Sequence, residues 1–308
     1  MVNAMPLCDH QDKVKFMKLL TTRSIGLFLI GMGLFQHSFA QQTNKNIPDS
    51  HEFKVMLKNE RFISMNEGIK GLEKAIVEKS AGSKVVFDIE KKPKFRIVTY
   101  LDTKKCHLKN NDFILRKRFT LKGGVPDRIK VTLKFRGSDV DTVGEKVFIA
   151  QPSEDLTKSK FEVDIVKGAS SPAYKFSRSA SIEVGKFNKI SGLMAIYPVL
   201  KELESSGHPK IKKPEVKLKR VNKFTAFETV VDVGAIKIAE GKCDASFSFW
   251  YKTKEKSKPI AAEFSYVCKK ESDEANQLFQ TILGLSEWGS SNSTTKTAIA
   301  YDDFCPSQ

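Results

Sequence analysis

Short segments in which charged and apolar residues alternate recur along this chain. In RIKVTLKFR (128–136), Arg128, Lys130, Lys134 and Arg136 fall on one parity and apolar residues on the other. Successive side chains of a β-strand point to opposite faces, so this segment predicts a strand with one basic and one apolar face. Similar alternation predicts strands at HEFKVML (51–57), KVVFDI (84–89), KFRIVTYL (94–101), FILRKRFTL (113–121), KFEVDIV (160–166), EVKLK (215–219), CDASFSFWYK (243–252) and PIAAEFSYVC (259–268).

Three segments repeat apolar residues at helical spacing instead. They are residues 63–82, 185–207 and 273–285. Amphipathic helices need an apolar surface to cover, and the strands segregate basic residues from acidic ones. We therefore predict an α+β fold: an antiparallel β-barrel, or tunnel, whose apolar side lies outward beneath the helices and whose charged side faces inward. The alternative is an ordinary sheet with its polar face in solvent, which is the favoured interpretation of any one strand alone.

The first forty residues have the pattern of a secretory signal peptide. Basic residues precede the apolar run IGLFLIGMGLF (25–35), and SFA (38–40) ends in small residues, so we predict cleavage after Ala40. A retained anchor is the weaker alternative, because the run is short for a bilayer. We expect an exported protein, periplasmic or extracellular, without a stable membrane anchor after cleavage. Residues 41–50 would be a polar lead, 51–300 the tunnel domain and 301–308 a tail.

The remaining chain is strongly basic. Residues 1–40 hold four Lys/Arg and two Asp/Glu, so the rest carries 48 and 34, a formal charge of +14. Such a charge favours a polyanionic small molecule as partner: triphosphate, polyphosphate or a nucleotide. We do not expect a nucleic acid, because the chain is exported and has no basic surface interleaved with aromatic residues. The histidines lie in no nucleophile motif, which argues against a Ser/His/Asp hydrolase.

Four cysteines follow the predicted cleavage point. An even count in an exported chain permits two disulfides, with three connectivities. Cys243 and Cys268 are equally far from the polar tip between the last two predicted strands, so they would face each other across a hairpin. By elimination, Cys106 would pair with Cys305. Buried free thiols are the alternative.

An inward array of Arg and Lys implies a ligand. Such an array would repel itself strongly if it were empty and dry, so the tunnel would hold water and anions. Guanidinium groups bind phosphate oxygens in a bidentate manner, and Lys acts as a point charge. Interspersed carboxylates could hold Mg²⁺ or Mn²⁺, which bridges phosphate oxygens.

The order of the motifs resembles the triphosphate tunnel metalloenzyme superfamily, also called CYTH proteins, over most of residues 50–300. The family's ExExK, YxDT, LRxR, LxLKxR, acidic, KxR and ExE segments look like SHEFK (50–54), TYLDT (99–103), LRKR (115–118), TLKFR (132–136), FEVD (161–164), KLKR (217–220) and AEFS (262–265). Two departures matter. Ser50 and Ser265 stand where the family has Glu, and a serine supplies no anionic oxygen.

The resemblance implies an antiparallel tunnel and metal-dependent hydrolysis of a phosphoanhydride in triphosphate, polyphosphate or a nucleoside triphosphate, with Mg²⁺ or Mn²⁺. By carry-over, and by shared parity for Lys130 and Lys217, phosphate would be held by Lys54, Arg116, Arg118, Lys130, Lys134, Arg136, Lys217 and Lys219. Glu52, Glu162 and Glu263 would be the catalytic and metal-binding carboxylates, and Asp164 a further metal ligand.

The two serines leave open whether the protein is an enzyme. One alternative is a polyanion-binding protein with weakened catalysis, for polyphosphate or a nucleotide. Another is an envelope β-protein without an anion site. Lys296, in the late segment TTKT (294–297), could reach a tunnel mouth, but a solvated loop lysine is the favoured interpretation.

Overall fold

The computed structural model describes residues 46–80, 87, 92–151, 159–183, 189–201, 216–238, 241–291, 294–302, 304 and 305. They fall within one unit, Thr43–Gln308. The predicted signal peptide, its cleavage point, most of the predicted strand 84–89 and parts of the predicted lead and tail lie outside these residues. No helix in the described ranges is both long and apolar enough to cross a membrane.

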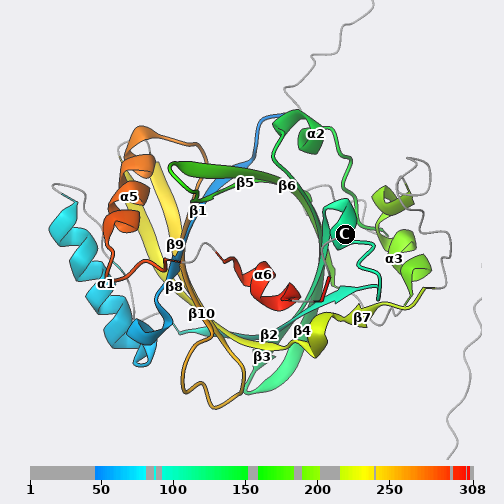
Figure 1. Ribbon diagram of the computed structural model, residues 1–308, viewed down its shortest axis with the longest axis horizontal. Coiled ribbons are helices and arrows are strands. Elements are labelled where there is room, and N and C mark those ends of the chain that lie inside the picture. Colours follow the sequence, from blue (N-terminus) through cyan, green and yellow to red (C-terminus); the bar gives the residue numbers. More distant parts are fainter. Residues whose placement is uncertain are drawn as a thin grey trace, which may run out of the picture. The chain divides into compact units, whose positions relative to one another are not determined.

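Nine of the described strands close into a ring, in the order β3–β4–β6–β5–β1–β10–β9–β8–β2 and back to β3 (Figure 1). Their bounds are β1 Ser50–Leu57, β2 Lys94–Asp102, β3 Phe113–Lys122, β4 Val125–Gly137, β5 Ser159–Lys167, β6 Pro172–Glu183, β8 Ala226–Ile238, β9 Gly241–Tyr251 and β10 Ala261–Cys268. Neighbours are antiparallel except β1 and β5, which run parallel. The fold class predicted from the sequence is confirmed, with this one parallel pairing as a difference.

Most of the described helices cover the outside of the ring. The helices are α1 Met65–Lys79, α2 Val140–Gly144, α3 Ile190–Ile196, α5 Asp273–Gly284 and α6 Lys296–Tyr301, with 3-10 turns at Asn59–Phe62, Lys109–Asn111, Pro198–Lys201 and Val221–Lys223. α1 and α5 lie against the same side of the ring (Figure 1), where Leu72 and Phe279 join a core with Phe53 and Phe247. α3 covers β3 and β4, where Leu193 packs into a second core. Burying a side chain of this kind contributes about 2–3 kcal/mol.

Several elements differ from the sequence prediction, among them one helix and one strand. The helix predicted at 185–207 is described only as α3 and the following 3-10 turn, and its other residues lie outside the described ranges. Strand β6 was not predicted, because the inward positions Ser177, Ser179 and Ser181 carry no charge to mark the alternation. β6 completes the ring between β4 and β5.

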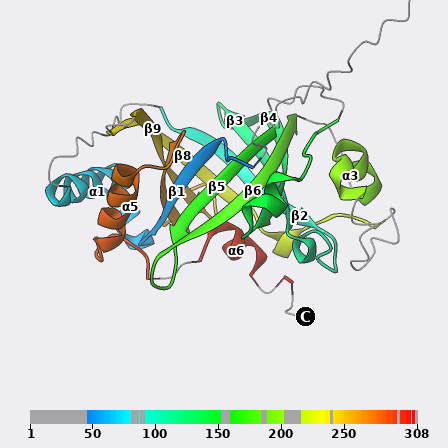
Figure 2. The same cartoon turned by 90° about the horizontal axis from the view of Figure 1, so that it is seen from above.

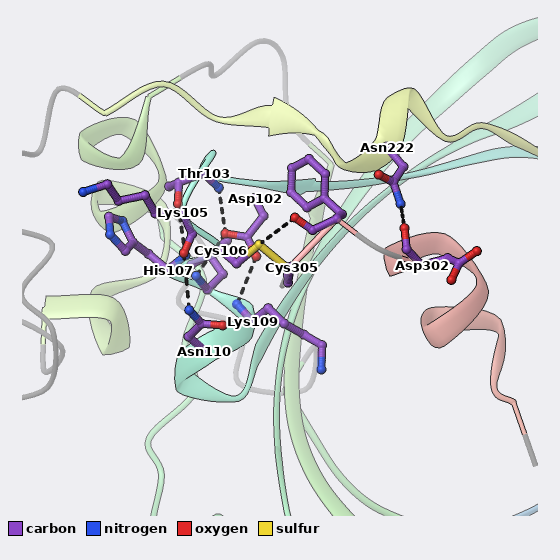
Figure 3. Close-up of a disulfide and its surroundings, with 12 residues drawn as sticks. Asp102, Thr103, Lys105, Cys106, His107, Lys109, Asn110, Asn222, Asp302 and Cys305 are labelled. Atoms are coloured by element: carbon purple, nitrogen blue, oxygen red, sulfur yellow. Dashed lines mark hydrogen bonds between the residues drawn. A yellow bond between two sulfur atoms is a disulfide. The ribbon is translucent and has the colours of Figure 1, made fainter. Parts of the chain in front are cut away.

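Both predicted disulfides are present. Cys243 and Cys268 join β9 to β10, and Cys106 joins Cys305 near the C-terminus. Figure 3 shows the second, beside the turn that follows β2. The Asp102 carboxylate holds this turn by accepting backbone N–H groups of Thr103 at 2.7 Å and of Leu108 and Lys109 at 3.0 Å. The disulfide therefore attaches the C-terminal segment to a fixed turn.

Helix α6 occupies one end of the ring. Looking along the tunnel, it lies within the ring (Figure 1), and from above it lies at one edge of the strands (Figure 2). Its Tyr301 packs with inward-facing Val98, Tyr100 and Trp250 in an apolar cluster. Thr295 caps the helix by accepting the N–H of Ala298 at 3.2 Å. This end of the tunnel is apolar, and the charged positions lie further along the strands.

Candidate functional site

The interior of the ring is a cavity of about 610 Å³ lined mainly by polar and charged side chains. Alternate residues of each strand point inward, so Lys130, Lys134 and Arg136 of β4 line the cavity while Val131 and Leu133 lie in the outer core. Among the described residues, twelve Lys or Arg and five Asp or Glu line the cavity. The interior is therefore strongly positive.

Asp164 on β5 is the centre of one group of charges. Its side chain is only 3% exposed and lies 2.8 Å from Lys54 Nζ and 3.2 Å from Arg136 Nη2. Burial would raise the pKa of Asp164, but Lys134, Lys54 and Arg136 hold it well below its usual range. Burial would likewise lower the pKa of Lys54, but Asp164 and Glu52 raise it above its usual range. Asp164 and Lys54 are therefore both ionised at neutral pH.

Glu162 extends this group along β5. Its carboxylate lies 3.5 Å from Lys134 Nζ and 3.7 Å from Lys160 Nζ. Burial lowers the pKa of Lys134, which Lys54 and Arg136 lower further, while Asp164 and Glu162 oppose them. Each of these acids is thus in contact with at least one cation.

A second group of charges joins β2, β8, β10 and α6. Glu228 is buried and accepts hydrogen bonds from Ser248 Oγ at 2.9 Å and Trp250 Nε1 at 3.0 Å. Arg96 lies 3.4 Å from its other oxygen. Burial would raise the pKa of Glu228, but Lys296 and Arg96 lower it to about 2. Lys296 Nζ also lies 2.8 Å from Glu263 Oε1.

The wall formed by β3 and β4 carries cations without acidic partners. Arg116, Arg118 and Lys130, here called the basic wall, form no ion pair with any described carboxylate. Arg116, followed by burial and Arg96, lowers the pKa of Arg118 to about 9. Burial, followed by Arg118, lowers the pKa of Lys130. The lowered pKa values record repulsion among these cations, which Glu228 offsets only in part at Arg118.

The size of this repulsion can be estimated from strand geometry. Arg116 and Arg118 lie two residues apart on the same face of β3, a spacing of about 7 Å. At an effective dielectric constant of about 20, two unit charges at this distance repel by about 2 kcal/mol. An anion between them would remove this cost and add charge-assisted hydrogen bonds of about 1.5–3 kcal/mol each. The basic wall therefore favours an anionic ligand.

The predicted carboxylates do not fit a divalent metal ion as they stand. Glu52 contacts Lys54, and Glu162, Asp164 and Glu263 have the cationic contacts given above. Within the described ranges, one trio of metal-type ligand atoms lies within 4.8 Å of one another: Asp102, Cys106 and Cys305. Both sulfurs of that trio are in a disulfide, so they cannot be thiolate ligands. A hard cation requires several free oxygen ligands, which these residues do not offer.

Ten of the twelve predicted site residues line the cavity. They are Glu52, Lys54, Arg116, Arg118, Lys130, Lys134, Arg136, Glu162, Asp164 and Glu263. Lys217 and Lys219 do not, and both are exposed. Their segment is no strand of the ring: β7 (Lys219–Arg220) pairs only with the last residues of β2, and Lys217 forms an isolated bridge with Lys189.

Seven charged residues of the cavity are not among the predicted site residues: Lys58, Arg96, Lys160, Lys167, Lys175, Glu228 and Lys296. Arg96 and Glu228 alternate with apolar residues in their strands, but inward-facing apolar residues such as Val98 share their parity and hide the signal. Lys296 was interpreted as a solvated loop lysine, and this is wrong, because its side chain is only 18% exposed and lies in the cavity. No helical periodicity marks the six residues of α6.

No family model and no curated protein matches this chain. Solved structures similar to it include a protein from Hippeastrum assigned as an adenylyl cyclase and described as having a dominant triphosphatase activity (11% identity, 80% of this chain and 93% of that chain, TM-score 0.42). Proteins assigned as adenylate cyclases from Bacillus halodurans (16% identity, 80% and 93%, TM-score 0.35) and Vibrio parahaemolyticus (10%, 78% and 87%, 0.28) are also similar. At these TM-scores the likeness is weak and carries no functional argument.

Proposed function

We propose that the tunnel binds a small linear polyanion of the triphosphate or polyphosphate type, free or as part of a nucleotide. The observation that carries this proposal is the basic wall, in which Arg116, Arg118 and Lys130 face the cavity without a carboxylate partner. Two neighbouring guanidinium groups suit phosphate oxygens, which they bind in a bidentate manner. The cavity volume of about 610 Å³ lies within the range of about 300–1,000 Å³ that is usual for small-molecule sites.

The opposite side of the cavity supports binding more than catalysis. Asp164, Glu162, Glu228 and Glu263 are each in contact with Lys or Arg. These pairs offset much of the positive charge around the acids, whereas the three cations of the basic wall have no carboxylate partner. A chain of phosphate groups would lie along Arg116, Arg118 and Lys130, where it displaces no protein ion pair. The arrangement is one of a receptor for an anion.

Metal-dependent hydrolysis is the second candidate. The predicted catalytic residues Glu52, Glu162 and Glu263 all line the same cavity as the basic wall, which favours it. Their contacts with Lys54, Lys134 and Lys296 disfavour it, since an ion-paired carboxylate is a poor ligand for Mg²⁺ or Mn²⁺. Binding is therefore the function that the geometry supports better.

We also propose that the protein acts after export, in a periplasmic or extracellular compartment. The two disulfides support this location, because such bonds persist in oxidising compartments and are rare in the cytosol. The expected ligand is then a soluble phosphate compound of that compartment.

Calorimetric titration with tripolyphosphate, with longer polyphosphate and with ATP tests the proposal. We expect binding that weakens as ionic strength rises, and an affinity loss of about tenfold or more in Arg118→Ala. Lys117→Ala is the matched control: it removes a cation from the same strand, outside the cavity, and should change affinity by less than twofold. Absence of salt-sensitive binding to all three ligands would refute the proposal.

Phosphate release measured in the same samples, with Mg²⁺ or Mn²⁺, separates the two candidates. Turnover that is lost in Glu263→Gln would establish the hydrolase. Binding without turnover would establish the receptor.

A further inference from the structure

Lys296 enters the cavity from a helix and not from the ring. It is the first residue of α6, and its Nζ lies 2.8 Å from Glu263 Oε1, 3.0 Å from Ser248 Oγ and 4.0 Å from Glu228 Oε1. Three neighbouring strands, β8, β9 and β10, thus each present one oxygen to a single ammonium group. The centroid of the Trp250 ring lies 5.7 Å from the same Nζ.

The oxygens around Lys296 form a cation site. Glu228 and Glu263 are ionisable and nearly buried, and Ser248 supplies a neutral oxygen between them. Two carboxylates and a hydroxyl are ligands that a hard divalent cation accepts. Here the cation is a side chain of the protein, and a metal ion could enter only if Lys296 left.

Lys296 is held in place at both ends of its helix. The Thr295 side chain caps α6, and Tyr301 packs in the apolar cluster at the end of the ring. Beyond α6, Cys305 is joined to Cys106. Withdrawal of the Lys296 backbone would require α6 to leave the ring against these contacts.

We propose that Lys296 takes the place of a divalent metal ion in this tunnel, so that anion binding is metal-independent and loss of Lys296 creates a divalent-cation site at Glu228 and Glu263. Lys54, which lies 2.8 Å from both Glu52 and Asp164, neutralises the other carboxylate pair in the same way. The first half of the proposal rests on the anion-binding function proposed above. The second half concerns the protein without any anion.

The first measurement is Mn²⁺ binding in the absence of an anion. Binding is monitored through the decrease in the electron paramagnetic resonance signal of free Mn²⁺. The wild type should bind no Mn²⁺ in the cavity at micromolar concentration, whereas Lys296→Met should bind one ion. Lys296→Arg, which keeps the charge, should behave as the wild type. Lys175→Met is the matched control, because Lys175 lines the cavity without an ion pair to a described carboxylate. It removes the same charge and should gain no Mn²⁺ site.

Two outcomes of this measurement would overturn the proposal. One is Mn²⁺ binding by the wild type that Glu263→Gln abolishes. The other is a folded Lys296→Met protein, checked by circular dichroism, that binds no Mn²⁺. If Lys296→Met does not fold, the wild-type measurement still decides, because the proposal requires that it bind none.

The second measurement is tripolyphosphate affinity of the wild type in EDTA and in Mg²⁺. The proposal expects tight binding in EDTA that added Mg²⁺ does not strengthen. Binding that requires Mg²⁺ would overturn this proposal and leave the anion-binding function standing. Absence of tripolyphosphate binding in both buffers would instead overturn the anion-binding function. The Mn²⁺ measurement would still test the role of Lys296.

Discussion

Lys54 on β1 lies 2.8 Å from Asp164 on β5, its neighbour across the one parallel pairing described in the ring. The register sets Glu52 opposite Asp164, so one ammonium group contacts both carboxylates. Arg136 and Lys134 approach the same acid from β4. Asp164 is the most buried acid of the cavity. Its negative charge neutralises these cations, which would be costly to enclose in the ring without a partner.

Replacement of Asp164 by Asn should therefore be strongly destabilising. Removing one partner of a buried ion pair leaves an uncompensated charge and costs about 3–5 kcal/mol. Urea denaturation measures the loss, and Glu52→Gln is the matched control. Glu52 contacts the same lysine but is 21% exposed, so its loss should cost about 1 kcal/mol or less. Equal losses of unfolding free energy in the two variants would show that burial does not determine how much Asp164 contributes to stability.

Arg116→Met should separate stability from binding. It removes the largest cause of the lowered pKa of Arg118 and the buried Arg116 Nε, which has no hydrogen-bond partner. We expect the free energy of unfolding without ligand to rise by about 1–2 kcal/mol. Affinity for tripolyphosphate should fall about tenfold or more in the same variant. Urea curves with and without the anion check both changes, with Lys117→Met as control. A less stable ligand-free variant would contradict the expectation.

Glu228 should make stability depend on acidity. Its folded pKa is about 2 against an ordinary 4.5. A lowered carboxyl pKa contributes stability above the unfolded value, here about 3 kcal/mol, and the contribution is lost as pH falls from about 4.5 towards 2. Glu228→Gln should lose stability at neutral pH and show a flatter pH dependence below 4.5. Glu78→Gln, an exposed change on α1, should keep the wild-type dependence. Parallel curves of unfolding free energy against pH for the wild type and Glu228→Gln would contradict the lowered pKa of Glu228.

The two disulfides should differ in what they stabilise. Cys106 and Cys305 are 199 residues apart, so their bond should contribute about 5 kcal/mol by loop-closure entropy, against about 3 kcal/mol for the 25-residue separation of Cys243 and Cys268. Replacing Cys106 and Cys305 with Ala should also speed amide hydrogen exchange in α6. The Cys243 and Cys268 double variant should leave α6 exchange unchanged. Faster α6 exchange in both variants would mean that global unfolding, and not local attachment, controls it.

Strand parity was enough to predict the ring and most of its interior. In β4 and β5, charged residues occupy most of the inward positions, with Thr132 and Val166 as exceptions, so the pattern indicates which face they share. The amphipathic helices need the apolar face of the strands to pack against, and this requirement predicts that the charged face lies inside. Parity does not reveal strand order, which is why the parallel neighbour of β1 was not foreseen.

The errors arise where a local pattern carries no tertiary information. Lys217 and Lys219 alternate as well as any inward pair, but the segment contributes only two residues of strand, outside the ring. Lys296 has no pattern at all, since its position depends on a six-residue helix held by packing and by a distant cysteine. The positions of Lys217, Lys219 and Lys296 are determined by contacts that form only in the folded chain.

The position of α6 at one end of the ring also limits how a polymer could use the cavity. A phosphate chain longer than the cavity could not thread through the apolar cluster formed by Tyr100, Trp250 and Tyr301. Only its terminal units would be enclosed. The protein would therefore recognise the ends of a chain and not its internal phosphate groups. Affinity per chain should then level off once the length exceeds what the basic wall can contact, and capping both terminal phosphates with bulky esters should abolish binding.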